Sequence, residues 1–271
     1  MQIDDIEFHF FRNFLKESSG YHLTDDKRYL LESRLEDVLR SWKLNDHRAI
    51  ISSIRNDQSS KMATDVIEAM TINETFFFRD QIPFDVFENQ LLDRLAESAV
   101  ANRVRIWSAA CSTGQEPYSV AMIATEKRSV YPKLLCDVVG TDINSRVLSR
   151  ARQGLFSDIE VHRGLPDHYR NKYFTRDGSN WKINDDIRTL VHFRQMNLKG
   201  DYDVEGPFDF VLLRNVLIYF DTALKESILR RIADRMRPGG YLLLGAAEGI
   251  YDLNHHFQRC PDIKGLYEYR G

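Results

Sequence analysis

Apolar residues recur at two different spacings along this chain, and the change from one spacing to the other divides it into two parts. From residue 4 to about residue 70 the spacing is that of an amphipathic helix, with pairs such as Phe11 and Leu15, or Leu31 and Leu35, four positions apart. Residues 1–70 therefore predict a small all-α N-terminal domain.

Beyond residue 84, helical segments alternate with short runs of β-branched and aromatic residues, which is typical of a doubly wound, mostly parallel α/β sheet. Residues 71–83 fit neither period and predict an ordered connector. Residues 166–190 interrupt the alternation and predict a small inserted antiparallel β-subdomain, with a hairpin turn at 177–180. The expected strands are 104–109, 135–141, 191–196, 208–213, 241–245 and, closing the sheet edge, 266–270, and the expected helices are 84–99, 117–127, 144–152 and 222–236.

The composition is that of an ordinary globular protein, with 43% hydrophobic and 28% charged residues among 271. A net charge of -3 supplies no basic field for nucleic acid or for an anionic membrane. The three cysteines lack the spacing of metal ligands, so neither a zinc site nor a disulfide framework is expected. No signal peptide and no apolar run of roughly 18 residues is found. We expect a soluble, cytoplasmic protein that inserts into no membrane and binds no metal.

Candidate chemistry begins at the turn after the strand 104–109. This turn contains a single glycine, Gly114, so the three-glycine fingerprint of a dinucleotide site is absent. The small residues at 109–113 still permit close approach by a ligand without phosphate, such as the amino-acid portion of S-adenosylmethionine. Small residues also end ordinary buried strands, so this turn alone does not identify a site.

Two carboxylates follow these strands. Asp142 ends the second strand, where it could accept both ribose hydroxyls of a nucleoside, or could instead cap the helix that begins near Asn144. Glu116 opens the helix after the first strand, where an acidic residue complements the helix dipole. It is also within reach of a cationic amino or sulfonium group.

Four motifs in this order closely resemble the CheR family of chemotaxis protein methyltransferases. They are Asn-Glu-Thr-Phe-Phe-Phe-Arg at 73–79, Ser-Thr-Gly-Gln-Glu-Pro-Tyr-Ser at 112–119, Gly-Thr-Asp-Ile at 140–143 and Arg-Asn-Val-Leu-Ile-Tyr-Phe at 214–220. The resemblance implies a Rossmann-like methyltransferase domain at 84–271. It also implies methyl esterification of glutamate side chains, from S-adenosylmethionine, on the cytoplasmic helical bundle of methyl-accepting chemoreceptors.

The resemblance further implies roles for individual residues. Arg79 and Tyr219 would lie beside the transferred methyl group. Asn197 and Leu198 would flank the adenine, and Arg214 and Asn215 would line the cofactor side of the fourth strand. The remaining cofactor contacts would come from Asn73, Thr75, Arg79, Glu116 and Asp142.

The chemistry of such a substrate agrees with these residues. A glutamate with a pKa of about 4.3 is already ionised at neutral pH, so its attack on a sulfonium methyl needs no general base. Arg79 could orient the incoming carboxylate through its planar guanidinium. Alternatively, Arg79 pairs with Asp80 or Glu74, Tyr219 is a buried ring with a satisfied hydroxyl, and the phenylalanines at 76–78 serve in packing.

Two features depart from the family pattern. The second N-terminal helix carries as many acidic as basic side chains, where family members are thought to present a basic face to acidic receptor helices. The loop at 176–180 is shorter than in members that tether to a receptor pentapeptide, which predicts a tether-independent enzyme. Two other functions remain open: a methyltransferase for nucleic acid or a small molecule, and a cofactor-binding adaptor without turnover.

Overall fold

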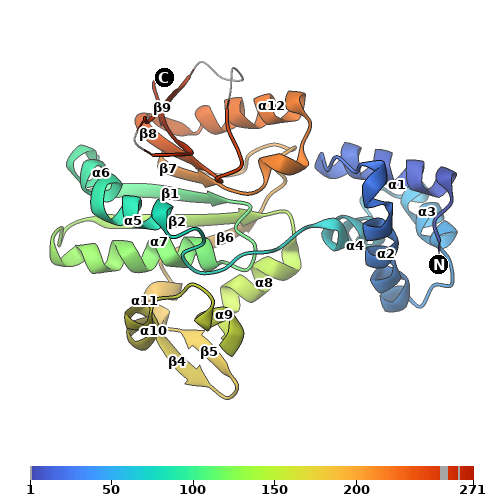
Figure 1. The fold of residues 1–271 in the computed structure, drawn as a ribbon, viewed down its shortest axis with the longest axis horizontal. Coiled ribbons are helices and arrows are strands. Elements are labelled where there is room, and N and C mark those ends of the chain that lie inside the picture. Colours follow the sequence, from blue (N-terminus) through green and yellow to red (C-terminus); the bar gives the residue numbers. More distant parts are fainter. Residues whose placement is uncertain (1, 251–255, 262) are drawn as a thin grey trace.

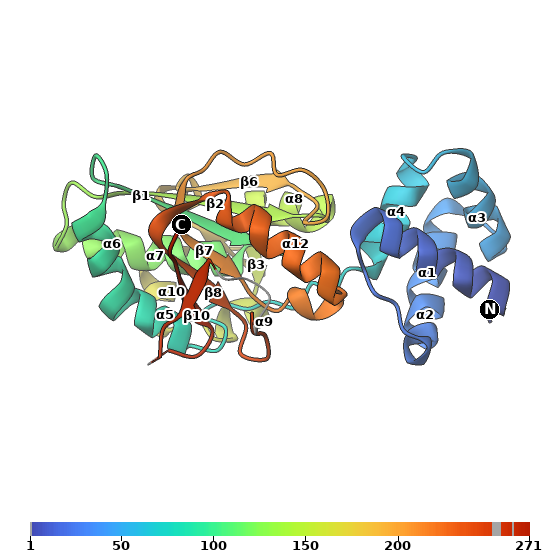
Figure 2. The ribbon, with the colours of Figure 1, turned by 90° about the horizontal axis from the view of Figure 1, so that it is seen from above.

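The N-terminal domain of the computed structural model is built from helices whose apolar faces pack on one another, as their spacing predicted. The structure describes residues 2–250, 256–261 and 263–271. A capping box of Asp4 and Glu7 starts the first helix, and Gly20, with φ of +78°, ends it. The helices lie together as one group (Figures 1 and 2), and their buried side chains form one cluster. The elements are α1 (Asp5–Ser19), η1 (Asp25–Lys27), α2 (Arg28–Trp42), α3 (His47–Asn56) and α4 (Lys61–Met70).

The second domain contains a seven-stranded sheet within the described residues, in the order β6-β2-β1-β7-β8-β10-β9. The first five strands in this order are parallel, and β10 and β9 pair antiparallel. The order reverses between β1 and β7, so the predicted doubly wound, Rossmann-like sheet is confirmed. The strands are β1 (Arg103–Ala109), β2 (Leu135–Asp142), β6 (Val191–Gln195), β7 (Phe208–Leu213), β8 (Met236–Leu244), β9 (Phe257–Arg259) and β10 (Leu266–Tyr269).

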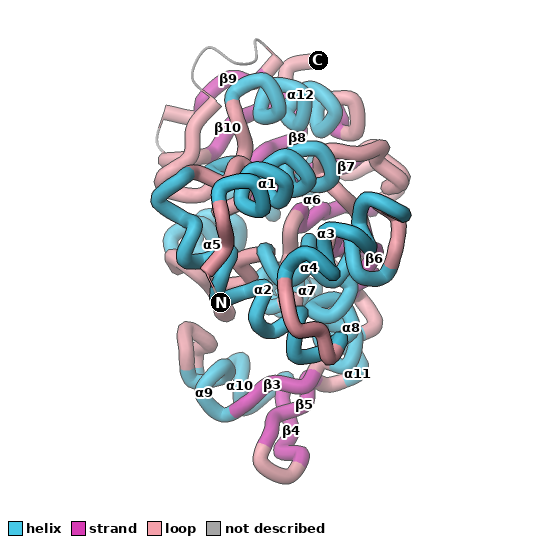
Figure 3. Tube along the Cα trace, turned by 90° about the vertical axis from the view of Figure 1, so that its right-hand side faces the viewer, coloured by secondary structure: helices cyan, strands magenta, loops and turns pink. Residues whose placement is uncertain are grey.

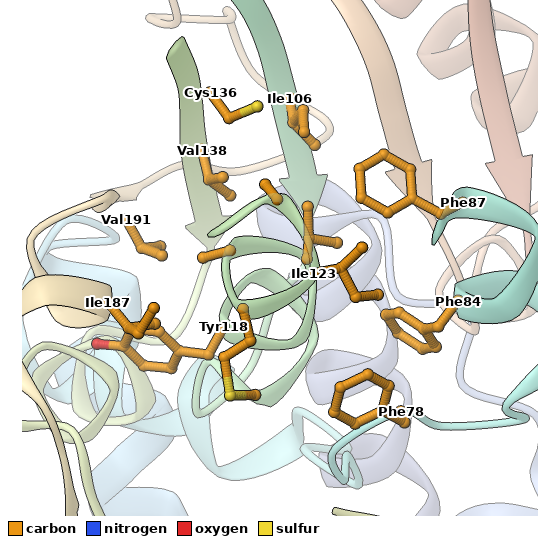
Figure 4. Close-up of a cluster of buried hydrophobic side chains, with 14 of the residues drawn as sticks. Phe78, Phe84, Phe87, Ile106, Tyr118, Ile123, Cys136, Val138, Ile187 and Val191 are labelled. Carbon is orange, nitrogen blue, oxygen red and sulfur yellow. The ribbon is translucent and has the colours of Figure 1, made fainter. Parts of the chain in front are cut away.

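Helices cover both faces of this sheet. On one face, Phe84 and Phe87 from the helical segment before β1, and Tyr118 and Ile123 from the helix after it, pack beside Ile106 of β1 (Figure 4). The opposite face packs against the helix that follows β7 (Figure 1). The helices are α5 (Ile82–Val86), η2 (Phe87–Leu91), α6 (Leu92–Ser98), α7 (Gln115–Glu126), η3 (Lys127–Ser129), α8 (Ser145–Gln153), η4 (Leu217–Tyr219) and α12 (Thr222–Ala233).

A small antiparallel sheet is inserted between α8 and β6, with strand order β3-β5-β4 (Figures 1 and 3). The predicted hairpin is present, and its turn contains Gly178 with φ of +59°. The strand β3 precedes the range 166–190, and three residues are too few to carry a periodic signal. The insert consists of β3 (Leu155–Ser157), α9 (Asp158–His162), α10 (Asp167–Tyr173), β4 (Phe174–Asp177), β5 (Asn180–Ile183) and α11 (Asp185–Arg188).

Two elements predicted near the end of the chain are present, but the predicted end of the helix and the predicted edge of the sheet were wrong. The helix predicted at 222–236 ends at Ala233, and Met236 instead begins β8, which continues through Gly240. A Cβ at Gly240 would lie 2.9 Å from the backbone oxygen of Asp209, so glycine permits the strand to run close beside β7. The strand predicted at the sheet edge, β10, is covered by β9, whose Phe-Gln-Arg sequence lacks a strand pattern.

Hydrogen bonds and an ion pair between α4 and α8 hold the two domains together. The Ser145 backbone N–H and Oγ donate to Glu68 Oε1 over 2.8 and 2.6 Å, and Arg146 Nε lies 3.2 Å from Glu68 Oε2. Asn197 Nδ2 donates to the Ser18 carbonyl of α1 over 2.7 Å. These contacts fix the N-terminal domain beside the carboxyl edge of the sheet. Within the described residues, every helix is too short or too polar to cross a bilayer.

Candidate functional site

A pocket of about 1010 Å³, counting its open mouth, lies at the carboxyl ends of the parallel strands, between the two domains. This is where open α/β sheets bind ligands, because the strand order reverses there. Side chains from the N-terminal domain, the connector and the loops after β1, β2, β6 and β7 line it. The structure brings together all the site residues that the sequence predicted: Asn73, Thr75, Arg79, Glu116, Asp142, Asn197, Leu198, Arg214, Asn215 and Tyr219.

The floor of the pocket is the turn between β1 and α7. Its backbone bends sharply, with φ of +59° at Ala110, +51° at Ser112 and +92° at Gly114. A Cβ at Gly114 would lie 3.0 Å from the Ala151 side chain, and one at Gly140 would lie 3.0 Å from the sulfur of Cys111. These two glycines therefore let the turn pack closely against β2 and α8, and Ala110, Cys111 and Ser112 of the turn line the pocket.

Asp142 ends β2 as a buried carboxylate. It accepts the backbone N–H of Ser112 and that of Asn144, each over 2.9 Å. Burial raises the pKa of Asp142, and these N–H donors act in the opposite direction. The alternative role as helix cap belongs to Asn144, whose side-chain oxygen accepts from Arg146 and Val147 at the start of α8. The carboxylate of Asp142 retains lone pairs for a further hydroxyl donor.

Glu116 and Arg214 form an ion pair under the pocket. Ser108 Oγ donates to Glu116 Oε1 over 2.7 Å, and Arg214 Nη1 donates to Glu116 Oε2 over 2.9 Å. The second guanidinium nitrogen of Arg214 donates to the Arg79 carbonyl over 2.8 Å and to Asp80 Oδ2 over 2.7 Å. Arg214 thus joins the end of β7 to both α7 and the connector.

Neither surface ion pair considered for Arg79 forms. Its guanidinium donates over 2.6 Å to the backbone carbonyl of Glu74, whose carboxylate pairs with Arg163, while Asp80 pairs with Arg214. The connector turns here with φ of +67° at Asp80. This turn directs Arg79 to the wall of the pocket, and its guanidinium keeps donors for an anion.

The three phenylalanines of the connector have two different roles. Phe77 and Phe78 are buried in the core of the α/β domain, as the packing interpretation expected. Phe76 is half-buried, and the guanidinium carbons of Arg79 and Arg163 lie 5.6 and 4.4 Å from its ring centre. Its ring therefore supports the two arginines.

Asn73 and Asn197 use their polar groups to hold the walls of the pocket. Asn73 Nδ2 donates to Thr71 Oγ1 over 3.0 Å, and its carbonyl accepts from Ser112 Oγ over 2.9 Å. The Asn197 side chain donates to Ser18 and accepts the Lys199 N–H. Because the polar groups of Asn197 are already used, the loop after β6 can contact a ligand through the apolar side chain of Leu198 and the backbone around it.

Tyr219 comes from η4, directly after β7, and its ring lies 5.9 Å from the ring of Tyr21 at an interplanar angle of 31°. Burial raises the pKa of Tyr219, so the phenol is neutral at physiological pH. Sequence reasoning missed Tyr21, which lines the pocket from the N-terminal domain with a buried hydroxyl that makes no hydrogen bond within the described residues. Its position after a helix in another domain carries no local signal for a site.

Glu248 was also missed. Its carboxylate accepts the backbone N–H groups of Asn215, Val216 and Gly245 over 2.7, 2.9 and 2.8 Å. Glu248 follows the carboxyl end of β8, as Asp142 stands at the end of β2. A single carboxylate just after a strand is therefore the sequence signal that could have identified it.

Fold and pocket together define a Rossmann-like nucleoside-binding domain joined to a helical domain. A model of the CheR methyltransferase all-alpha domain matches residues 6–71, and a model of the CheR methyltransferase SAM binding domain matches residues 73–265. The chain belongs to the CheR methyltransferase family, and its cofactor is S-adenosylmethionine. The pocket fits this cofactor, because it opens over the turn of small residues after β1 and the buried carboxylate of Asp142 stands beside it at the end of β2.

Curated relatives match almost the whole chain. Chemotaxis protein methyltransferase Cher2 of Pseudomonas putida is 37% identical, covering 98% of both chains. Chemotaxis protein methyltransferase 1 of Vibrio cholerae is 38% identical, covering 95% of both. The chemotaxis protein methyltransferase of Salmonella typhimurium is 31% identical, covering 95% of this chain and 88% of its own. A solved TehB-like SAM-dependent methyltransferase from Corynebacterium glutamicum aligns with a TM-score of 0.39 and 14% identity, covering 67% of this chain and 84% of that one.

Proposed function

We propose that this protein transfers a methyl group from S-adenosylmethionine to glutamate side chains of methyl-accepting chemoreceptors, forming glutamate methyl esters. Membership of the CheR family and the names of the relatives support a chemotaxis methyltransferase. The observation that carries the proposal is that one pocket at the sheet edge is lined both by the small-residue turn after β1 and by Arg79 and Tyr219, which could bind a carboxylate.

The roles of the residues follow from their positions. Asp142 would accept the ribose hydroxyls, and Glu116 would hold the amino group of the methionine portion. Leu198 would pack against the adenine. When bound, S-adenosylmethionine supplies an electrophilic methyl group on a positively charged sulfur. Arg79 and Tyr219 would hold the substrate carboxylate in line with that methyl, and no group of the protein has to remove a proton, because the carboxylate is already ionised.

The N-terminal domain would contribute to receptor recognition, since it forms one wall of the pocket mouth. A C-terminal receptor tether is not part of the proposal. The strands β4 and β5 are joined by Gly178 and Ser179 alone, which leaves a compact hairpin in place of a long loop. We propose that receptors are methylated equally with or without their last five residues.

The test is a methyl transfer assay with the full-length protein, labelled cofactor and cytoplasmic receptor fragments. The expected result is base-labile label that mass spectrometry maps to glutamate side chains, at equal rates on intact and C-terminally truncated fragments. Stable label on RNA, DNA or a small molecule would contradict the proposed substrate. Tight cofactor binding without turnover would favour an adaptor, and loss of methylation on truncated fragments would establish a tether.

A further inference from the structure

Backbone N–H groups converge on one carboxylate where β7 and β8 end. Glu248 Oε2 accepts from Asn215 over 2.7 Å and from Gly245 over 2.8 Å. Oε1 accepts from Val216 over 2.9 Å and from Ile218 over 3.4 Å. The four acceptor positions of a carboxylate are thus matched by four donors. Such a set of convergent N–H groups is an anion-binding nest, and here the anion is part of the chain.

The nest arises from the sheet itself. The parallel strands β7 and β8 are in register at Leu213 and Leu244, the last residue of each. The N–H groups that follow them lie beyond the last rung of the ladder and need another acceptor. Gly245 makes room for it, because a Cβ there would lie 2.7 Å from Glu248 Oε2. The site is therefore shaped for a carboxylate.

The segment that Glu248 holds carries three pocket residues. It runs from Asn215 to Tyr219, and Asn215, Val216 and Tyr219 line the pocket. Asn215 has φ of +57°, a left-handed conformation that asparagine tolerates better than most residues with a side chain. Two of the N–H groups bound by Glu248, those of Asn215 and Val216, belong to this turn. Without the carboxylate, the N–H groups of this turn lose their acceptor, and the start of the loop that carries Tyr219 is held less firmly.

We propose that Glu248 is a positioning residue for methyl transfer, and that its removal turns the nest into a binding site for a small free carboxylate such as formate or acetate. The first half of this proposal rests on the proposed function, because it concerns the placement of Tyr219 beside the reacting groups. The second half concerns the nest alone and is measured without turnover.

The test is chemical rescue of Glu248→Ala. We expect kcat on receptor fragments to fall by roughly tenfold to a hundredfold, the usual effect of displacing a reacting group by about an ångström. The affinity for S-adenosylhomocysteine should fall less than kcat, since the adenine and ribose contacts lie on other loops. Added acetate or formate should restore kcat in a saturable manner. It should also raise the thermal unfolding temperature of Glu248→Ala and leave that of the wild type unchanged.

Three matched variants complete the test. Glu248→Gln fills the nest with an amide whose NH₂ opposes the N–H donors, so kcat should fall without rescue by acetate. Gly245→Ala keeps the charge but displaces the carboxylate, and it should reproduce the loss of kcat. Glu226→Gln, on the exposed side of α12, should behave as the wild type.

Wild-type kcat in Glu248→Gln would overturn the positioning role. If acetate neither restores activity to a folded Glu248→Ala variant nor raises its unfolding temperature, the proposal that the nest binds a free carboxylate is refuted. A wild-type protein that forms no glutamate ester would refute the proposed function and the positioning role with it, while the thermal measurement would still decide on the nest.

Discussion

The guanidinium of Arg214 and the carboxylate of Glu116 form an ion pair of 2.9 Å whose side chains are only 2% and 11% exposed. The pair connects the loop after β7 to the first turn of α7, and both residues line the pocket. Ser108 on one side, and Asp80 and the Arg79 carbonyl on the other, provide further hydrogen bonds. This buried pair holds its loops in one arrangement, and it is costly to break because the surviving charge stays buried.

Replacing Glu116 by Gln should therefore destabilise the protein. We expect the free energy of unfolding to fall by about 3 kcal/mol, the lower end for a broken buried pair, because Asp80 remains as a partner of Arg214. Urea unfolding without cofactor measures this loss. Asp37→Asn, which removes the exposed partner of Arg40, should cost less than about 1 kcal/mol. Equal losses in the two variants would contradict the importance of burial.

Replacing Asp142 by Ala should weaken binding of S-adenosylhomocysteine by about 1.5 to 3 kcal/mol, the usual effect of losing a charged hydrogen-bond partner. Titration calorimetry measures the change. Asp137→Ala, a carboxylate on the same strand whose partner is Arg103 outside the pocket, is the matched control and should bind as the wild type does. Unchanged affinity in Asp142→Ala would remove Asp142 from the site.

The sequence predicted the parts of this molecule that depend on local pattern. The strands before Cys111 and Asn144 were expected because apolar runs end there in small or polar residues, and Asp142 was noticed by its position at a strand end. Tyr21 reaches the pocket only through contacts between distant segments, which a local period does not encode. The hydrogen bonds from Glu248 to the loop after β7 likewise join segments that are far apart in the sequence. The strand β9 was missed for a related reason, since pairing with β10, not its own composition, makes it a strand.

His47 should make the stability depend on pH. It is 2% exposed, and burial lowers its pKa below the usual value, although Glu7 acts in the opposite direction. Below about pH 6.5 the unfolded chain therefore takes up a proton that the folded chain resists. The stabilisation is present above that pH and is lost as the pH falls.

Urea unfolding of the wild type at about pH 7.5 and about pH 5.5 should give a difference of up to about 1.4 kcal/mol from this residue. His47→Leu should reduce the difference by that amount, and His9→Gln, at an exposed position of α1, should leave it as in the wild type. An identical pH dependence in His47→Leu and the wild type would show that His47 is not responsible.

Arg79→Ala should reduce turnover far more than cofactor affinity. The guanidinium lies at the pocket wall with donors available to an anion, so its loss removes an interaction with the reacting carboxylate. We expect kcat to fall by about a hundredfold and the affinity for S-adenosylhomocysteine to change by less than about tenfold. Arg79→Lys, which keeps the charge and loses the planar fork, should be intermediate. Arg163→Ala is the matched control, because Arg163 contacts the same Phe76 ring from the insert. A wild-type kcat in Arg79→Ala, or an equal loss in Arg163→Ala, would mean that Arg79 supports the connector and does not orient the substrate.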